Sequence, residues 1–83
     1  MNTSSDFFKV AYDFFRSKNL SIYNSLLLTV FIKRRFGTSK TPSYWEEWID
    51  RLNSGSIQSY MDSESQKVFN EIREELIFIM EIV

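Results

Sequence analysis

The sequence predicts an all-α protein, a compact bundle of about four helices that forms a single domain over residues 1–83. Two observations predict it. Apolar residues recur three and four positions apart along most of the chain, which is the spacing of one face of a helix. Glycine and proline together number only three residues, too few for the many tight turns that a β-rich fold requires.

The first helix is expected over residues 5–18. The hydroxyl group of Ser4 or Ser5 is suited to cap its start, and Asn19 tolerates the left-handed conformation in which helices often end. The apolar positions follow helical spacing and are Phe7, Val10, Ala11, Phe14 and Phe15.

The second helix is expected over residues 21–36, with Ser21 as its N-cap and Gly37 just beyond its end. Residues 26–32, however, are almost all apolar and include three β-branched side chains, so a short buried strand would have the same pattern. We favour a helix, because cap signals stand at both ends and the sequence offers no second strand to pair with. Its apolar middle predicts the most buried element of the fold.

The third helix is expected over residues 43–53. Ser43 and Glu46 have the spacing of a capping box directly after Pro42, which favours a helix start there. One face of this helix carries the apolar side chains Trp45, Trp48, Ile49 and Leu52. Residues 56–61 are expected to form a turn or a short helical piece.

The fourth helix is expected over residues 62–82, with Asp62 as its N-cap. The stripe predicted to face the core consists of Val68, Phe69, Ile72, Leu76, Ile79, Met80 and Val83. Residues 76–83 are apolar on nearly every side, with Glu81 as the exception. An apolar helix end of this kind must dock into the core, pair with another subunit or bind something else. The sequence leaves these alternatives open.

The residue types exclude several kinds of chemistry. Cysteine and histidine are both absent, which excludes disulfide bonds, zinc sites built on Cys or His, and nucleophiles activated by histidine. Glu71 and Glu75, with Glu74 beside them, have a spacing that can bind a hard cation, but a solvated helix face explains them as well. We therefore expect no enzyme activity, no cofactor and no metal.

Neither a targeting signal nor a membrane span is predicted. The first residues lack the basic flank and apolar run of a signal peptide. The longest apolar stretch falls far short of the roughly 20 residues that a membrane-spanning helix needs. The absence of cysteine fits a reducing compartment. We expect a cytoplasmic protein with no membrane contact.

The charges divide between the two halves of the chain. Residues 1–40 hold seven basic and two acidic side chains, whereas residues 41–83 hold three basic and nine acidic ones. The halves could neutralise each other by packing together, or their polarity could steer a partner. Basic residues concentrate around the end of the second helix, at Lys33, Arg34, Arg35 and Lys40. Because they could bind phosphate groups, nucleic-acid binding is the alternative function, although a sequence pI of about 5.3 lacks the usual basic character.

Two surfaces are candidates for a protein interface. The first is the aromatic group Tyr44, Trp45 and Trp48, in which two tryptophans share a helix face and form either a core pair or a binding site. The second is the apolar end of the fourth helix, with Leu76, Ile77, Phe78, Met80 and Ile82. The leading expectation is a small regulator, adaptor or inhibitor that docks on a larger protein or associates with itself as a homodimer. Small accessory proteins of phages and plasmids often have this profile.

Overall fold

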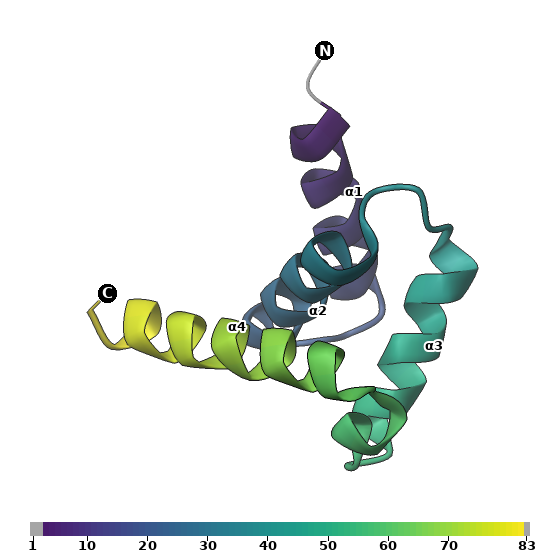
Figure 1. Ribbon diagram of the computed structural model, residues 1–83. Coiled ribbons are helices and arrows are strands. Elements are labelled where there is room, and N and C mark those ends of the chain that lie inside the picture. Colours follow the sequence, from purple (N-terminus) through teal and green to yellow (C-terminus); the bar gives the residue numbers. More distant parts are fainter. Residues whose placement is uncertain (1–2, 83) are drawn as a thin grey trace.

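The computed structural model describes residues 3–82, and the side chains of residues 6–81 within them. Its helices are α1 Thr3–Ser17, α2 Ile22–Phe36, α3 Pro42–Asn53, the short 3-10 helix η1 Ile57–Tyr60, and α4 Ser63–Ile82. No strand occurs in residues 3–82, so the all-α prediction is confirmed and the alternative of a strand at residues 26–32 is wrong. In Figure 1, α2 lies at the centre, α1 rises above it, α3 stands to its right and α4 runs along its lower side.

Only the C-terminal end of α1 agrees with the prediction from the sequence. The helix already begins at Thr3, so Ser4 and Ser5 lie inside it and the cap predicted at one of them is wrong. Serine and threonine are tolerated in a first turn, where the N–H groups have no partner within the helix in any case. At the other end, Asn19 has a φ of 69°, the left-handed conformation that the sequence predicts for it.

Local signals set both ends of α2, as predicted. The hydroxyl oxygen of Ser21 accepts a hydrogen bond from the Asn24 N–H at 3.0 Å, which caps the first turn. After the helix, Gly37 has a φ of 84°, a conformation that glycine adopts easily because it lacks a Cβ. The Gly37 N–H donates to the Lys33 carbonyl at 3.0 Å and so completes the last turn.

The start of α3 differs from the prediction by one residue. The helix begins at Pro42 with Thr41 as the preceding cap residue, and the capping box of Ser43 and Glu46 is therefore wrong. Proline suits the first helical position, because its φ is already helical and its missing N–H would have no partner there. Glu46 instead lies with its Oε1 atom 3.1 Å from Nζ of Lys18, at the end of α1.

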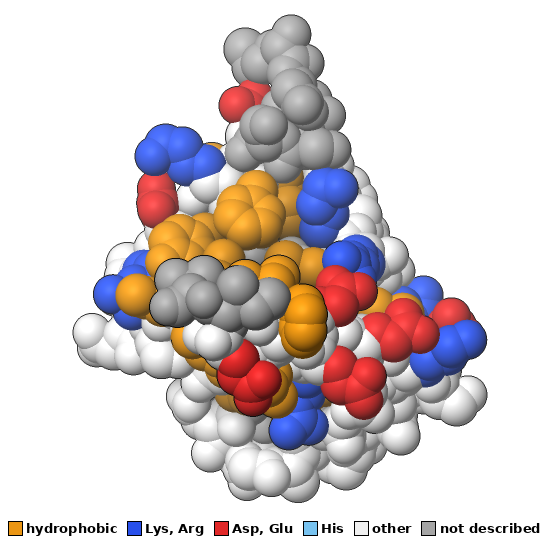
Figure 2. Space-filling model, turned by 90° about the vertical axis from the view of Figure 1, so that its left-hand side faces the viewer, with side chains coloured by type: hydrophobic (Ala, Val, Ile, Leu, Met, Phe, Trp, Pro, Cys, Tyr) orange, Lys and Arg blue, Asp and Glu red, His pale blue; other side chains and the backbone are white. Residues whose placement is uncertain are grey.

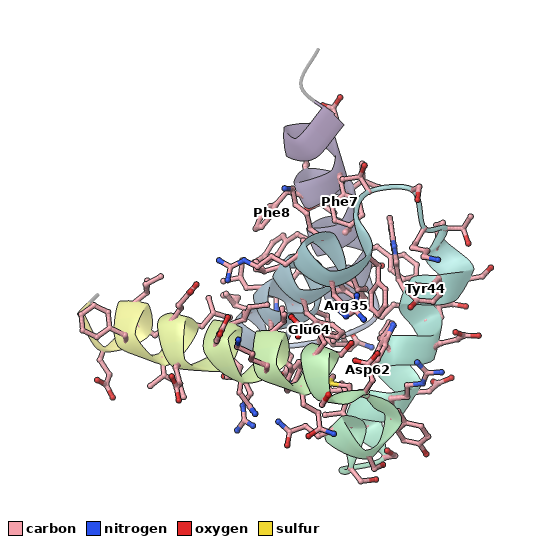
Figure 3. The ribbon with its side chains drawn as sticks, in the orientation of Figure 1. Phe7, Phe8, Arg35, Tyr44, Asp62 and Glu64 are labelled. Atoms are coloured by element: carbon pink, nitrogen blue, oxygen red, sulfur yellow. The ribbon has the colours of Figure 1, made fainter. Side chains whose placement is uncertain are left out.

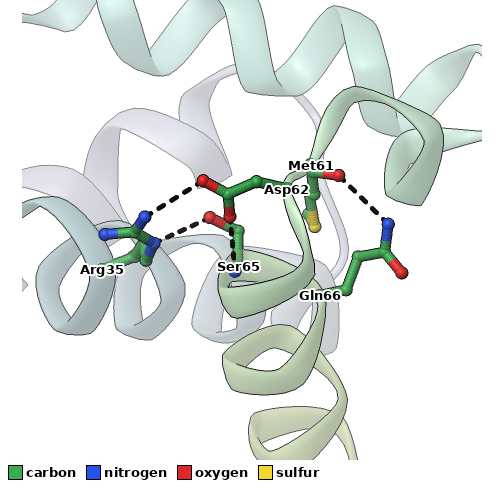
Figure 4. Close-up of polar contacts among 5 residues, drawn as sticks. All are labelled: Arg35, Met61, Asp62, Ser65 and Gln66. Carbon is green, nitrogen blue, oxygen red and sulfur yellow. Dashed lines mark hydrogen bonds and ion pairs between the residues drawn. The ribbon is translucent and has the colours of Figure 1, made fainter.

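A short helical piece and a capped helix start follow α3, both as predicted. Residues 57–60 form η1, and the Asp62 carboxylate then accepts a hydrogen bond from the Ser65 N–H at 2.8 Å. Gln66 ties the two helices together by donating from Nε2 to the carbonyl of Met61 at 3.0 Å (Figure 4). The base of α4 is thereby held to the turn that precedes it.

Phe31 of α2 forms the centre of the core. Its side chain is fully buried, and its ring makes edge-to-face contacts with Trp48 of α3 at 5.1 Å and Phe69 of α4 at 5.4 Å between ring centroids. Phe36 stands beside it at 5.7 Å in the same geometry. Aromatic pairs in this arrangement contribute about 0.5–1.5 kcal/mol beyond the burial of their area. One residue of α2 therefore joins three helices.

Trp45 forms a second aromatic cluster, which joins α1 to α3. Its ring lies 5.6 Å from Phe7, 5.5 Å from Phe14 and 6.3 Å from Phe15 between centroids. The indole N–H groups of Trp45 and Trp48 have no hydrogen-bond acceptor in the structure. The surrounding rings offer them only the weak acceptor of a π face. The packing of these tryptophans is thus apolar contact rather than polar anchoring.

The stripe that α4 contributes to the core is shorter than predicted. Phe69, Ile72 and Leu76 are buried, but Ile79 and Met80, predicted to face the core, are exposed, and Val83 lies outside the described residues. The reason is length. A helix of 20 residues spans about 30 Å, whereas the 15 residues of α2 span only about 22 Å. The last turns of α4 therefore project beyond the body of the protein (Figure 1).

Replacing Phe31 by alanine is expected to lower the free energy of unfolding by about 3–5 kcal/mol, because the lost ring leaves a cavity between three helices. Urea denaturation at low protein concentration, followed by circular dichroism, measures the change. Phe78→Ala is the matched control. That ring is exposed on α4, so its loss is expected to change the free energy of unfolding by less than about 0.5 kcal/mol. An equal loss in both variants would contradict the central position of Phe31.

Candidate functional site

The final turns of α4 expose consecutive apolar side chains. Ile77 is 46% exposed, Phe78 64%, Ile79 52% and Met80 49%. Because successive residues of a helix point about 100° apart, four in a row cover every side of it. No single neighbouring helix could therefore bury them all. We call residues 77–81, which include Glu81, the α4 end.

A pair of partly buried aromatic side chains lies on α1. Phe8 and Tyr12 stack with centroids 6.4 Å apart and ring planes 8° from parallel, and both are only partly buried. Phe8 projects from α1 on the side toward which the α4 end extends (Figure 3). Figure 2 shows hydrophobic side chains gathered on this side of the molecule, above and around the end of α4. We call Phe8 and Tyr12 the α1 face.

Phe8 and Tyr12 are not among the site residues predicted from the sequence. Their signal was present, because two aromatic residues four apart share a helix face. They stand beside the main apolar stripe of α1 and are not part of it. Only the position of α1 relative to α4 shows that Phe8, on which Tyr12 stacks, lies on the side toward which the α4 end extends (Figure 3).

The tryptophan group is part of the core and offers no free surface to a partner. Trp45 is 4% exposed and Trp48 is 2% exposed. Tyr44 is half-buried, and its ring packs edge-to-face on Phe36 at 5.3 Å. Of the two alternatives that the sequence left open for Trp45 and Trp48, the structure has the core pair.

The second candidate interface, the apolar end of α4, does not include Leu76. Leu76 is buried in the core, whereas Ile77, Phe78 and Met80 are exposed as an interface requires. The side chain of Ile82 lies outside the described residues. The candidate surface of α4 therefore begins at Ile77.

The two arginines of the basic segment around the end of α2 form ion pairs with acidic side chains of the same chain. Arg34 forms a bidentate pair with Glu75, with its Nη2 atom 2.9 Å from Oε2. Arg35 donates from Nη2 to Asp62 at 3.2 Å and from Nε to the hydroxyl of Ser65 at 2.8 Å (Figure 4). These pairs join the basic first half of the chain to the acidic second half. They are partly exposed and contribute little energy each, but they fix α4 against α2.

The remaining basic residues do not converge on a phosphate site. Lys40 lies over the ring of Tyr44, with its Nζ atom 4.9 Å from the centroid. Lys33 is half-buried and has no acidic partner among residues 6–81. Two of the four residues proposed to contact nucleic acid are thus engaged with carboxylates, and a third packs on an aromatic ring.

The acidic group of α4 is not arranged as a metal site. Glu75 is paired with Arg34, while Glu71 and Glu74 are exposed. Within the described residues, no three acidic side chains lie close enough together to hold a metal ion. None of the helices in residues 3–82 has the length and apolar character needed to cross a membrane.

One open hollow lies between α1 and the segment that joins α2 to α3. It measures about 380 Å³, and its lining includes Val10, Lys40 and the edge of Trp45, with Asp6 at the rim. Lys40 and Asp6 are both exposed. A substrate site concentrates buried polar groups on the reacting atoms, and the lining of this hollow lacks them.

Comparison with known proteins adds no relative. The chain matches no protein-family model, no curated protein and no solved structure. The features that bear on function are therefore the exposed side chains of the protein itself, above all those of the α4 end and the α1 face.

The carboxylate at the start of α4 is perturbed by the contacts that hold this helix. The N–H and hydroxyl groups of Ser65 hold the pKa of Asp62 below its ordinary value of 3.8, and the nearby charge of Arg35 lowers it further. A lowered pKa in the folded state means that the ionised carboxylate stabilises the fold above pH 3.8. This contribution is lost as the pH falls through the folded pKa, below 3.8.

Asp62→Asn is expected to be less stable than the wild type at neutral pH and to approach the wild type below pH 3.8. Asparagine still caps a helix, so the substitution removes the charge and leaves the cap. Urea denaturation at a series of pH values measures the difference. Asp50→Asn is the control, since Asp50 is exposed and forms no ion pair among the described residues. A difference that does not change with pH would contradict the role of the Asp62 charge.

Proposed function

We propose that this protein is a non-enzymatic protein-binding module that docks through the α4 end together with the α1 face. The observation that carries the proposal is the run of four consecutive apolar side chains on the α4 end, each about half exposed or more. Contiguous apolar surface of this kind on a small protein marks a site of interaction. A regulator, adaptor or inhibitor would work through such a surface.

The form of this surface supports binding to a protein. The α4 end is helical before it meets a partner, so docking requires little further ordering of the backbone. Phe78 provides an aromatic anchor, and the stacked rings of Phe8 and Tyr12 provide two more. Interfaces with proteins are enriched in such side chains and in methionine, which Met80 supplies.

The residue types of the chain and its ion pairs argue against an enzyme and against a nucleic-acid-binding protein. The chain contains no histidine and no cysteine, and the carboxylates of α4 are exposed or paired with arginine. Nucleic-acid binding is the weaker alternative, because Arg34 and Arg35 already have acidic partners. A cytoplasmic location remains a prediction from the absence of cysteine.

Phe78→Asp is expected to abolish co-purification of the partner from cells that produce the protein, because it places a charge at the centre of the apolar surface. Val10→Asp is the matched control. Val10 is 56% exposed, and helical geometry places it on the opposite side of α1 from Phe8 and Tyr12. Circular dichroism and urea denaturation verify that both variants fold. The same set of captured proteins with wild type and Phe78→Asp, with a differently tagged second copy of the chain counted among them, would contradict the proposal.

Binding to generic DNA and RNA is expected to be absent even at low salt, where phosphate contacts are strongest. Fluorescence anisotropy with labelled duplex DNA and single-stranded RNA measures it across a salt series. Lys33→Ala combined with Lys40→Ala is the comparison variant. A steep salt dependence in the wild type that this variant reduces would favour the alternative function instead.

A further inference from the structure

We propose that the partner of the α4 end is a second copy of this chain. In the two-fold dimer, each copy lays its α4 end against the α1 face of the other. The proposal rests on the function proposed above and names the partner of that same surface. It follows from three features of the described residues, which are area, charge and placement.

The first feature is area. A stable interface buries about 800 Å² on each partner, which the few side chains of the α4 end do not supply alone. The α1 face adds Phe8 and Tyr12. The exposed side of α2 adds Leu26 and Val30, which are four residues apart and only partly buried. A two-fold dimer of this kind buries the α4 end and the α1 face together on each copy, whereas a single contact would bury only one of them on each partner.

The second feature is charge. The α4 end carries Glu81, and Glu74 stands two turns before it; both are exposed and neither forms an ion pair among the described residues. The α1 face is bordered by Lys9, whose only ionic partner among residues 6–81 is the exposed Asp13 one turn along, at 3.3 Å. Lys33 follows Val30 on the same side of α2 and has no acidic partner within the part of the chain whose side chains are described.

The unpaired charges beside the α4 end are therefore acidic, whereas the α1 face and Val30 have Lys9 and Lys33 beside them, with Asp13 next to Lys9. An exposed pair such as that of Lys9 and Asp13 contributes only about 0.3–0.5 kcal/mol and is easily exchanged for a new partner. A larger protein of unrelated sequence would need to supply basic groups opposite the α4 end and acidic groups opposite the α1 face. A second copy of this chain already carries them.

The third feature is placement. Both surfaces lie on one side of the molecule, with red side chains around the α4 end and blue ones beside the apolar area above it (Figure 2). A two-fold axis in front of this side brings the α4 end of each copy to the α1 face of the other at once. The interface then closes on itself, as in most homodimers, and leaves no free α4 end to recruit a third copy.

The size of the wild-type protein gives the first test. Sedimentation equilibrium and light scattering up to millimolar concentration are expected to show a dimer that dissociates on dilution. Phe78→Asp is expected to raise the dissociation constant by about 30-fold or more, as the loss of a central aromatic anchor does. Val10→Asp is expected to leave it unchanged. A wild-type monomer at every concentration, a series of ever larger oligomers, or a Phe78→Asp variant that still dimerises like the wild type would each overturn the proposal.

Exchange of charges between two variants gives the second test. One variant carries Glu74→Lys and Glu81→Lys, and the other carries Lys9→Glu and Lys33→Glu. Each alone is expected to be monomeric, because like charges then face each other at both contacts. Mixed in equal amounts, they are expected to form a heterodimer, in which one contact has reversed charges and the other has the original ones. Circular dichroism confirms that each variant folds.

The result of the mixture is specific to a second copy. A mixture that remains monomeric would overturn the pairing of the α4 end with the α1 face. A monomeric wild type whose capture of another protein is lost in Phe78→Asp would overturn the dimer and leave the proposed function standing. Failure of that capture experiment, with the dimer intact, would restrict the surface to self-association.

Discussion

The packing of three aromatic rings, those of Phe31, Trp48 and Phe69, is the contact on which the rest of the structure depends. These rings belong to α2, α3 and α4. Phe31 meets Trp48 and Phe69 edge-to-face, at 5.1 Å and 5.4 Å between ring centroids. A chain of 83 residues buries a smaller share of its surface than a larger domain does. It compensates with large rings, each of which removes about 150–250 Å² from water. The Trp45 cluster then fastens α1 to the same body.

The polar contacts direct α4, and through it the surface available for binding. Arg35 holds Asp62 and Ser65 at the start of the helix, and Arg34 holds Glu75 three turns later. Apolar packing between α2 and α4 ends at Leu76. Because α4 contacts α2 at its base and along its middle, only its remaining turns project beyond the body of the protein (Figure 1). The same contacts pair Arg34 and Arg35, two of the residues that nucleic acid would need, with acidic side chains of the same chain.

Most of the fold followed from local patterns in the sequence. The caps at Ser21, Gly37 and Asp62 depend on hydrogen bonds and backbone angles within a few residues, which is why they could be predicted. The prediction was less accurate where several residues suit the same role. Thr41 and Pro42 competed with Ser43 for the start of α3, and residues 26–32 satisfied two patterns until the neighbouring helices were known.

By itself, the sequence determined the helical class, the number of helices, the absence of chemistry based on histidine or cysteine, and the apolar character of the α4 end. The tertiary structure alone decided which apolar residues lie inside. Trp45 and Trp48 are buried and Phe78 is exposed, although all three have the same apolar character in the sequence. The physical reason is that burial depends on how far each helix extends past its neighbours. That is set by crossing geometry between residues distant in the chain, which no local spacing records.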